Sequence, residues 1–354
     1  MNINNIKNLI STAVLLLFFM QNTLAQTTWT VAIPPSGLTA QMGSVGFASF
    51  YGKYVAAGDD LKYISSNDGV NWADEGTIDV APGATVYDIT WISSVDRWVA
   101  STNVGLFMDA KIYTSASATS GTWTQSSTGL TNATALKFAN NFNNIIATTG
   151  EGKLLKSTDG INWTIQDISS VWGGTSAING IVYGGNQWVI VGSGGRIATS
   201  PNGNTWTLQS SPTGLSLQAI AYDFGRYVAV GPNNLAVWST NGINWTAATI
   251  GVASTFNDIA YGNGRFYAVG ANGAIVSSPD GVTWTVNNSN AGTGTTFRGV
   301  CQGFSSLSST LMAAVGGSTT ATAIRSQILP PGNDNCSGAT ALTPAATCSP
   351  INGT

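Results

Sequence analysis

Carboxylate side chains are the groups in this sequence best suited to acid–base chemistry, because none of its 354 residues is histidine. Four of them, Asp59, Asp88, Glu151 and Asp258, fall in turns or at the starts of predicted β-strands. Two carboxylates on either side of a glycosidic bond could hydrolyse it as acid and base or nucleophile. Aspartate also caps turns, and we favour this structural interpretation.

A second set of side chains could bind a ligand without catalysis. Trp172 lies in a long connection between two predicted strands, and Arg196 follows two glycines. An exposed aromatic ring beside planar hydrogen-bond donors suits a sugar or peptide surface. Arg298 is a third candidate, since other arginines recur at equivalent turn positions of a repeat. Alternatively, Trp172 is buried between neighbouring repeats, as large aromatic side chains usually are.

The composition excludes several classes of protein. Without histidine there can be no Ser-His-Asp triad and no histidine-ligated metal, and we expect neither a metal nor a cofactor. Only 8% of the residues are charged, with a net charge of -3, and the 13 basic residues are scattered. The chain therefore has no basic patch with which to bind nucleic acid.

A short motif recurs along the chain, with Ser, then Asp or Asn, then Gly, and finally Trp. When a degenerate copy that ends at Trp123 is counted, the spacing between successive copies from Trp72 to Trp284 is 39 to 51 residues, a period typical of four-stranded propeller blades. The Asp or Asn side chain can accept backbone N–H bonds in a tight turn, and Gly supplies the positive φ. The structural turn residues are Asp68, Gly69, Trp72, Asp159, Gly160, Trp163, Asn202, Trp206, Asn241, Trp245, Asp280 and Trp284.

Each repeat contains four short segments that alternate with turn signals and predict four strands. In the sixth repeat these are residues 256–261, 265–269, 274–277 and 283–286. The last repeat lacks its fourth strand, and residues 28–31 match that strand in sequence. The sequence therefore predicts an all-β, seven-bladed β-propeller over residues 26–329, whose ring is closed by the N-terminal strand.

The repeated motif resembles the Asp-box, or BNR, repeat of the sialidase superfamily, of tandem-repeat xyloglucanases and of photosystem II assembly-factor-like propellers. Most copies here are one residue shorter between Asp and Gly than that family's box. The resemblance implies a propeller whose boxes lie away from the ligand face. For a sialidase it would further imply a catalytic Tyr with a Glu partner, an acidic Asp and three arginines that bind a carboxylate.

The two ends of the sequence predict segments outside the propeller. Residues 1–25 contain an apolar run and a small-residue cleavage site, which is typical of a secretory signal peptide. Residues 330–354 read as a linker and the start of an incomplete second module, in which Cys336 and Cys348 could form a disulfide. Cys301 is expected to be a buried free thiol.

From these features we expect a secreted or cell-surface protein without a membrane span after signal cleavage, and a monomer. The function that we favour is non-catalytic, a binding or scaffold module for a glycan or a protein, because the catalytic groups of known mechanisms are missing. The alternative is a sialidase- or xyloglucanase-like glycoside hydrolase of the Asp-box type, which needs two carboxylates on the channel face.

Overall fold

The computed structural model of the chain describes residues 27–32, 34–79, 83–104, 109–130, 135–304, 310–317 and 321–328. Thr28–Gln327 form one compact unit, and a second unit contains Met1–Thr27 and Ile328–Thr354. The expected signal peptide, the expected C-terminal module and the cysteine pair lie outside the described residues.

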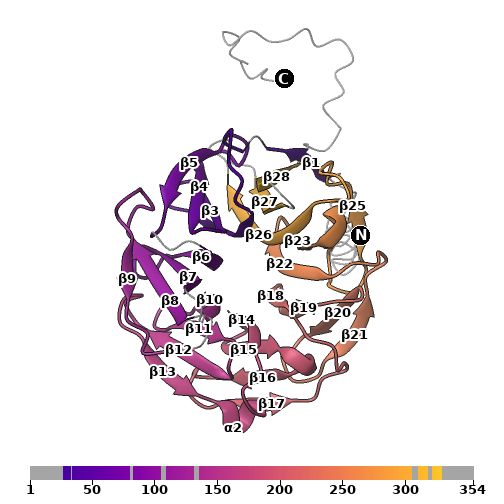
Figure 1. The fold of residues 1–354 in the computed structure, drawn as a ribbon. Helices are drawn as coiled ribbons and strands as arrows, with labels where there is room; N and C mark the ends of the chain where they lie inside the picture. Colours follow the sequence, from indigo (N-terminus) through magenta and orange to yellow (C-terminus); the bar gives the residue numbers. More distant parts are fainter. Residues whose placement is uncertain are drawn as a thin grey trace, which may run out of the picture. The chain divides into compact units, whose positions relative to one another are not determined.

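Seven four-stranded antiparallel sheets follow one another around a ring (Figure 1), which confirms the predicted propeller. Within each sheet the strands are called A to D from the channel outward. The first three blades are β2 (Met42–Ala48), β3 (Lys53–Gly58), β4 (Lys62–Ser66) and β5 (Ala73–Thr77); β6 (Thr85–Ile92), β7 (Arg97–Val104), β8 (Asp109–Ser115) and β9 (Thr124–Ser126); and β10 (Ala135–Asn140), β11 (Ile145–Thr149), β12 (Lys153–Ser157) and β13 (Thr164–Asp167).

The next three blades continue the pattern with short helical segments between some strands. They are β14 (Ile178–Gly184), β15 (Gln187–Gly192), β16 (Ile197–Ser200) and β17 (Thr207–Gln209); β18 (Ala219–Asp223), β19 (Arg226–Val230), β20 (Leu235–Ser239) and β21 (Thr246–Thr249); and β22 (Phe256–Gly262), β23 (Arg265–Gly270), β24 (Ile275–Ser278) and β25 (Thr285–Asn287). The helical segments are α2 (Ser169–Trp172), η1 (Ser193–Gly195) and η2 (Ala271–Gly273).

The seventh blade is assembled from both ends of the propeller, as the sequence predicts. Its strand order is β1-β28-β27-β26, from β1 (Thr27–Val31), β26 (Thr296–Phe304), β27 (Thr310–Gly317) and β28 (Ala321–Ile328). The Ala32 amide donates to the Ala323 carbonyl over 2.8 Å. Because β1 covers the outer edge of β28, the ring is closed by hydrogen bonds rather than by a covalent link.

Fourth strands begin later than the sequence predicts. In the sixth blade β25 starts at Thr285, two residues after the predicted start, because the amides of Val282 and Thr283 both donate to Asp280 Oδ1, over 2.9 and 2.8 Å. These two residues therefore belong to the turn. In the fifth blade β21 likewise starts at Thr246, after the amides of Ile243 and Asn244 have both donated to Asn241 Oδ1.

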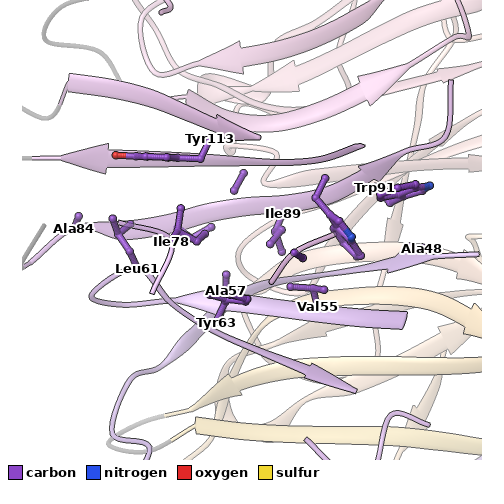
Figure 2. Packing of buried hydrophobic residues seen from close by; sticks show 14 residues of the cluster. Ala48, Val55, Ala57, Leu61, Tyr63, Ile78, Ala84, Ile89, Trp91 and Tyr113 are labelled. Carbon is purple, nitrogen blue, oxygen red and sulfur yellow. The ribbon is translucent and has the colours of Figure 1, made fainter. Parts of the chain in front are cut away.

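Apolar side chains fill the spaces between neighbouring blades. Between the first and second blades, Val55, Tyr63, Ile89 and Trp98 are each at most 2% exposed and belong to one cluster, most of which is labelled in Figure 2. Strands this short cannot bury both faces alone, so each blade depends on its neighbours for its core.

The recurring turns have the hydrogen bonds that their sequence predicts. In the first blade, Ser66 Oγ accepts from the Gly69 amide over 2.9 Å, and Asp68 Oδ1 accepts from the amides of Val70 and Asn71 over 2.8 Å each. Trp72 Nε1 donates to the Gly69 carbonyl over 3.2 Å. Asn241 makes the same pair of amide bonds in the fifth blade, so the motif needs an acceptor oxygen rather than a charge.

Substituting Asp68 tests that conclusion. Burial alone would raise the pKa of Asp68, but the amides of Asn71 and Val70 and the side chains of Asn71 and Ser66 lower it to about 2. We expect Asp68→Ala to lower the free energy of unfolding by about 1 kcal/mol, as loss of a comparable cap does, and Asp68→Asn to change it far less. Urea unfolding measures both. Between pH 4 and pH 2 the wild type should lose this contribution while Asp68→Asn keeps it, and an Asn variant as unstable as the Ala variant would contradict the interpretation.

Phe224 has a left-handed backbone conformation, which glycine and asparagine adopt more readily than bulky residues. Its φ is +49°, and its side chain is 84% exposed. Gly185 and Asn263 stand at the same turn position in the blades on either side, with φ of +55° and +52°. We expect Phe224→Asn to raise the free energy of unfolding by about 1 kcal/mol, because bulky side chains are disfavoured in the left-handed region. A decrease in urea unfolding experiments would mean that the ring contact of Phe224 with Tyr261, at 5.7 Å between centroids, outweighs the backbone cost.

Candidate functional site

One position near the start of every innermost strand faces the channel, and in six of the seven blades its side chain is polar or charged. In six of the seven blades the register of strand A shifts there, which marks a β-bulge. The fifth blade contributes the residue immediately before β18. We call these seven residues the mouth ring: Gly43, Tyr87, Lys137, Asn179, Gln218, Asn257 and Arg298.

The mouth ring encloses a cavity of about 510 Å³, completed by Thr85, Val86 and Thr296. All seven ring residues are half-buried. Two of the ring amides also join neighbouring blades, since Asn179 Nδ2 donates to the Leu217 carbonyl over 2.9 Å and Asn257 Nδ2 to the Phe297 carbonyl over 2.8 Å. These bonds hold the ring side chains in place before any ligand binds.

Below the ring lies a second cavity of about 310 Å³, which Asp88, Asp258, Ser44 and Cys301 help to line. Lys137 lines both cavities. Its side chain therefore forms the boundary between the mouth and the interior of the channel.

Lys137 reaches across the channel from β10 to carboxylates of two other blades. Its Nζ lies 3.5 Å from Asp88 Oδ1 on β6 and 3.5 Å from Asp258 Oδ1 on β22. The side chains of all three residues are at most 20% exposed. The ammonium group therefore links the second, third and sixth blades through the centre of the ring.

Backbone and hydroxyl donors hold the two carboxylates. Asp88 Oδ1 accepts from Ser44 Oγ over 2.8 Å, and Asp88 Oδ2 accepts from the Phe138 amide over 3.0 Å. Asp258 Oδ2 accepts from the Val300 amide over 3.0 Å. With these bonds the group also reaches the first and seventh blades.

Burial and charge shift the pKa values of this group. Burial alone would lower the pKa of Lys137, but the carboxylates of Asp258 and Asp88 raise it above its usual value. Burial raises the pKa of Asp258. Lys137 and the Val300 amide lower it by less, so the pKa lies above its usual value. Burial, with a smaller contribution from Asp258, also raises the pKa of the Cys301 thiol. This free cysteine is partly rather than fully buried, because its strand lines the channel.

Two of the four carboxylates that the sequence offered as candidates, Asp88 and Asp258, lie close together in the structure. Because Asp88 Oδ1 and Asp258 Oδ1 each lie 3.5 Å from one nitrogen, they are no more than twice that distance apart, about 7 Å. Lys137, which lies between them, was not predicted from the sequence as a site residue. Its one signal was a charged residue at the ring position of an otherwise apolar first strand.

The other two nominated carboxylates have local structural roles. Asp59 Oδ1 accepts from Thr85 Oγ1 over 3.2 Å, at the junction of the first two blades. Glu151 pairs with Lys153 of its own turn at 3.5 Å. Neither residue lines the mouth or the interior cavity.

Trp172 is fully buried, so the exposed aromatic surface that it could have offered to a sugar is not present. It packs with Ile168 and Ile178 between the third and fourth blades, which was the alternative interpretation. Its Nε1 donates to the Ser176 carbonyl over 2.9 Å, and Arg196 Nη1 donates to Ser176 Oγ over 3.0 Å. Both side chains thus secure the connection between two blades. Of the three non-acidic candidates, only Arg298 lies at the mouth.

Two kinds of site are absent from the described residues. Within them, no three or more cysteine, aspartate or glutamate side chains form a group that could hold a metal ion. No helix in the same part of the chain is long and apolar enough to cross a membrane.

No protein-family model matches the chain, and no curated protein sequence matches it. Several solved structures are similar to this chain in fold. YCF48 from Cyanidioschyzon merolae has a TM-score of 0.62 and 15% sequence identity, and the match covers 84% of this chain and 98% of that one. YCF48 bound to D1 peptide gives 0.61 and 14%, covering 84% and 94%. The WD40 β-propeller domain of Doa1 gives 0.65 and 12%, covering 85% and 97%. These similarities confirm the β-propeller but not a sialidase-type relationship.

Proposed function

We propose that this chain is a non-catalytic propeller that binds a peptide segment of a partner protein at its channel mouth. The observation that carries the proposal is the mouth ring, in which every blade supplies one half-buried position around a cavity of about 510 Å³. A cavity of that size suits a few residues of an extended chain. The signal peptide expected from residues 1–25 supports a partner that is secreted or on the cell surface.

Two observations favour a peptide over a glycan. Asn179, Gln218 and Asn257 offer amide groups, which pair readily with the peptide backbone. Trp172, the aromatic side chain that the sequence offered as a sugar contact, is fully buried and cannot serve as one. The similarity to YCF48, which has been solved with a D1 peptide, fits the same function.

The position of Lys137 supports a binding rather than a catalytic role. Glycosidases hold two carboxylates about 5–9.5 Å apart, with the scissile bond between them. Asp88 and Asp258 satisfy the distance, which is the observation in favour of the alternative hydrolase. However, the ammonium group of Lys137 occupies the space between their oxygens and pairs with both. We therefore expect no release of reducing sugar from polysaccharides.

The experiment compares two tryptophan substitutions in residues 26–329. Gln218→Trp would fill the mouth, whereas Thr246→Trp adds the same side chain to exposed β21 on the outside of the ring. A soluble random-hexapeptide library and a glycan array are offered to the wild type and both variants. Peptide binding that Gln218→Trp removes and Thr246→Trp retains would support the proposal. Binding of glycans alone, release of reducing sugar, or peptide binding unaffected by Gln218→Trp would overturn it.

A further inference from the structure

We propose that the mouth ring selects peptides that carry a carboxylate, and that Arg298 is the residue that binds it. This inference rests on the proposed peptide-binding function and specifies its ligand. The carboxylate can come from an aspartate or glutamate side chain or from a peptide C-terminus, because the chemistry that Arg298 recognises is the same.

The charges around the mouth are all of one sign. Among the described residues that line this cavity, Lys137 and Arg298 are cationic and none is acidic. Because Asp88 and Asp258 compensate the charge of Lys137, Arg298 is the lining residue whose positive charge can attract an anionic group.

Of the two cations, Arg298 is the one free to bind. Lys137 already pairs with Asp88 and Asp258. Within the described part of the chain, Arg298 takes part in none of the ion pairs. Arg298 is half-buried as a residue, and a charge-assisted bond in such a position is weakened less by solvent than on an open surface. The planar guanidinium also matches both oxygens of a carboxylate.

The ring position next to Arg298 carries no side chain. It is Gly43 of the first blade. A Cβ atom there would lie 2.4 Å from the Val86 carbonyl oxygen of the second blade, so a larger residue would force the backbone of two blades apart. The close approach of β2 to β6 therefore requires glycine here, and this ring position places no side chain beside Arg298.

The interior of the channel sets the depth at which the ligand stops. Below the ring, two carboxylates face a single ammonium group, and these carboxylates repel a second anion. A ligand carboxylate is therefore stable at the level of Arg298 and not deeper. The rest of the peptide must extend outward across the ring amides.

The test uses the soluble hexapeptide library in two forms, as C-terminal acids and as C-terminal amides. The Kd values of the best binders are measured by isothermal titration calorimetry without a label, because a fluorescein label would add a carboxylate of its own. Each is compared with versions in which Asp or Glu becomes Asn or Gln. We expect removal of the required carboxylate to weaken binding at least tenfold, as loss of a charged hydrogen-bond partner does. Comparing the acid, amide and side-chain versions shows which source supplies the carboxylate.

Arg298→Gln should weaken binding of the acidic peptides by about the same factor and leave their neutral versions unchanged, while Arg298→Lys should recover part of the loss. Arg265→Gln is the control, because Arg265 begins β23 at the opposite end of its blade, where it donates to Ser277. Circular dichroism should show that all variants are folded. Peptides that Gln218→Trp displaces but that bind equally well to wild type and Arg298→Gln would overturn this inference and leave the proposed function standing. Absence of any peptide binding at the mouth would overturn both.

Discussion

Replacing Lys137 with methionine is expected to lower the free energy of unfolding by about 3–5 kcal/mol, the cost of removing one partner from a buried charge group. Methionine keeps most of the side-chain volume but removes the ammonium group from between Asp88 and Asp258. The two carboxylates would then face each other across the channel without a counter-charge. Guanidinium unfolding at pH 7.5 measures the loss.

The pH dependence of the Lys137→Met defect separates lost charge from lost packing. Without the lysine, the carboxylates should be protonated more readily in the folded state than in the unfolded chain. Folded-state pKa values raised in this way make the variant gain stability as the pH falls, so its defect should be smaller at pH 4.5 than at pH 7.5. In the wild type the pKa of Lys137 is raised, so its stabilising contribution is present throughout this range and is lost only in strong alkali.

A matched variant removes all three charges. Asp88→Asn with Lys137→Met and Asp258→Asn leaves no unpaired charge, and we expect it to be more stable than Lys137→Met alone. In the asparagine that replaces Asp88, the side-chain oxygen can still accept from the Phe138 amide while the NH2 group donates to Ser44 Oγ. The asparagine that replaces Asp258 can still accept from the Val300 amide. A triple variant no more stable than the single one, or a defect independent of pH, would show that Lys137 acts through packing alone.

The fold could be predicted because a short sequence motif recurs along the chain and determines the local structure wherever it occurs. In five of the seven blades the turn motif contains its own Ser, Asp or Asn, Gly and Trp within seven residues, and hydrogen bonds inside these copies determine their shape. The closing strand was also readable, since residues 28–31 repeat the sequence of a fourth strand. Strand starts were less accurate, because whether Thr283 belongs to the turn depends on a side-chain bond to Asp280.

The channel could be predicted only in part. Asp88 and Asp258 drew attention as carboxylates near strand starts, but nothing local to either indicates Lys137. The three residues come from separate blades, and only closure of the ring brings them to the same point. For Trp172 the sequence suggested a ligand contact on the surface. In the structure, packing between two blades buries this side chain instead.

Closure of the ring itself depends on Trp29, and Trp29→Ala is expected to lower the free energy of unfolding by about 3–5 kcal/mol, as large-to-small substitutions of buried tryptophan do. Trp29 is 1% exposed, packs edge-on against Tyr267 at 6.0 Å between ring centroids, and shares a cluster with Phe297. It is the main apolar anchor of a five-residue strand with no covalent link to the blade that it completes.

Val31 on the same strand provides the control for Trp29→Ala. Its side chain is 47% exposed, so Val31→Ala should change stability by no more than about 0.5 kcal/mol. If β1 acts as the closing strand, amide hydrogens of β28 in Trp29→Ala should exchange faster than those of central blades such as β18–β21, because detachment of β1 exposes the edge of β28 first. Uniformly faster exchange in all seven blades would instead mean that Trp29 stabilises the propeller as a whole and that the ring opens only when it unfolds.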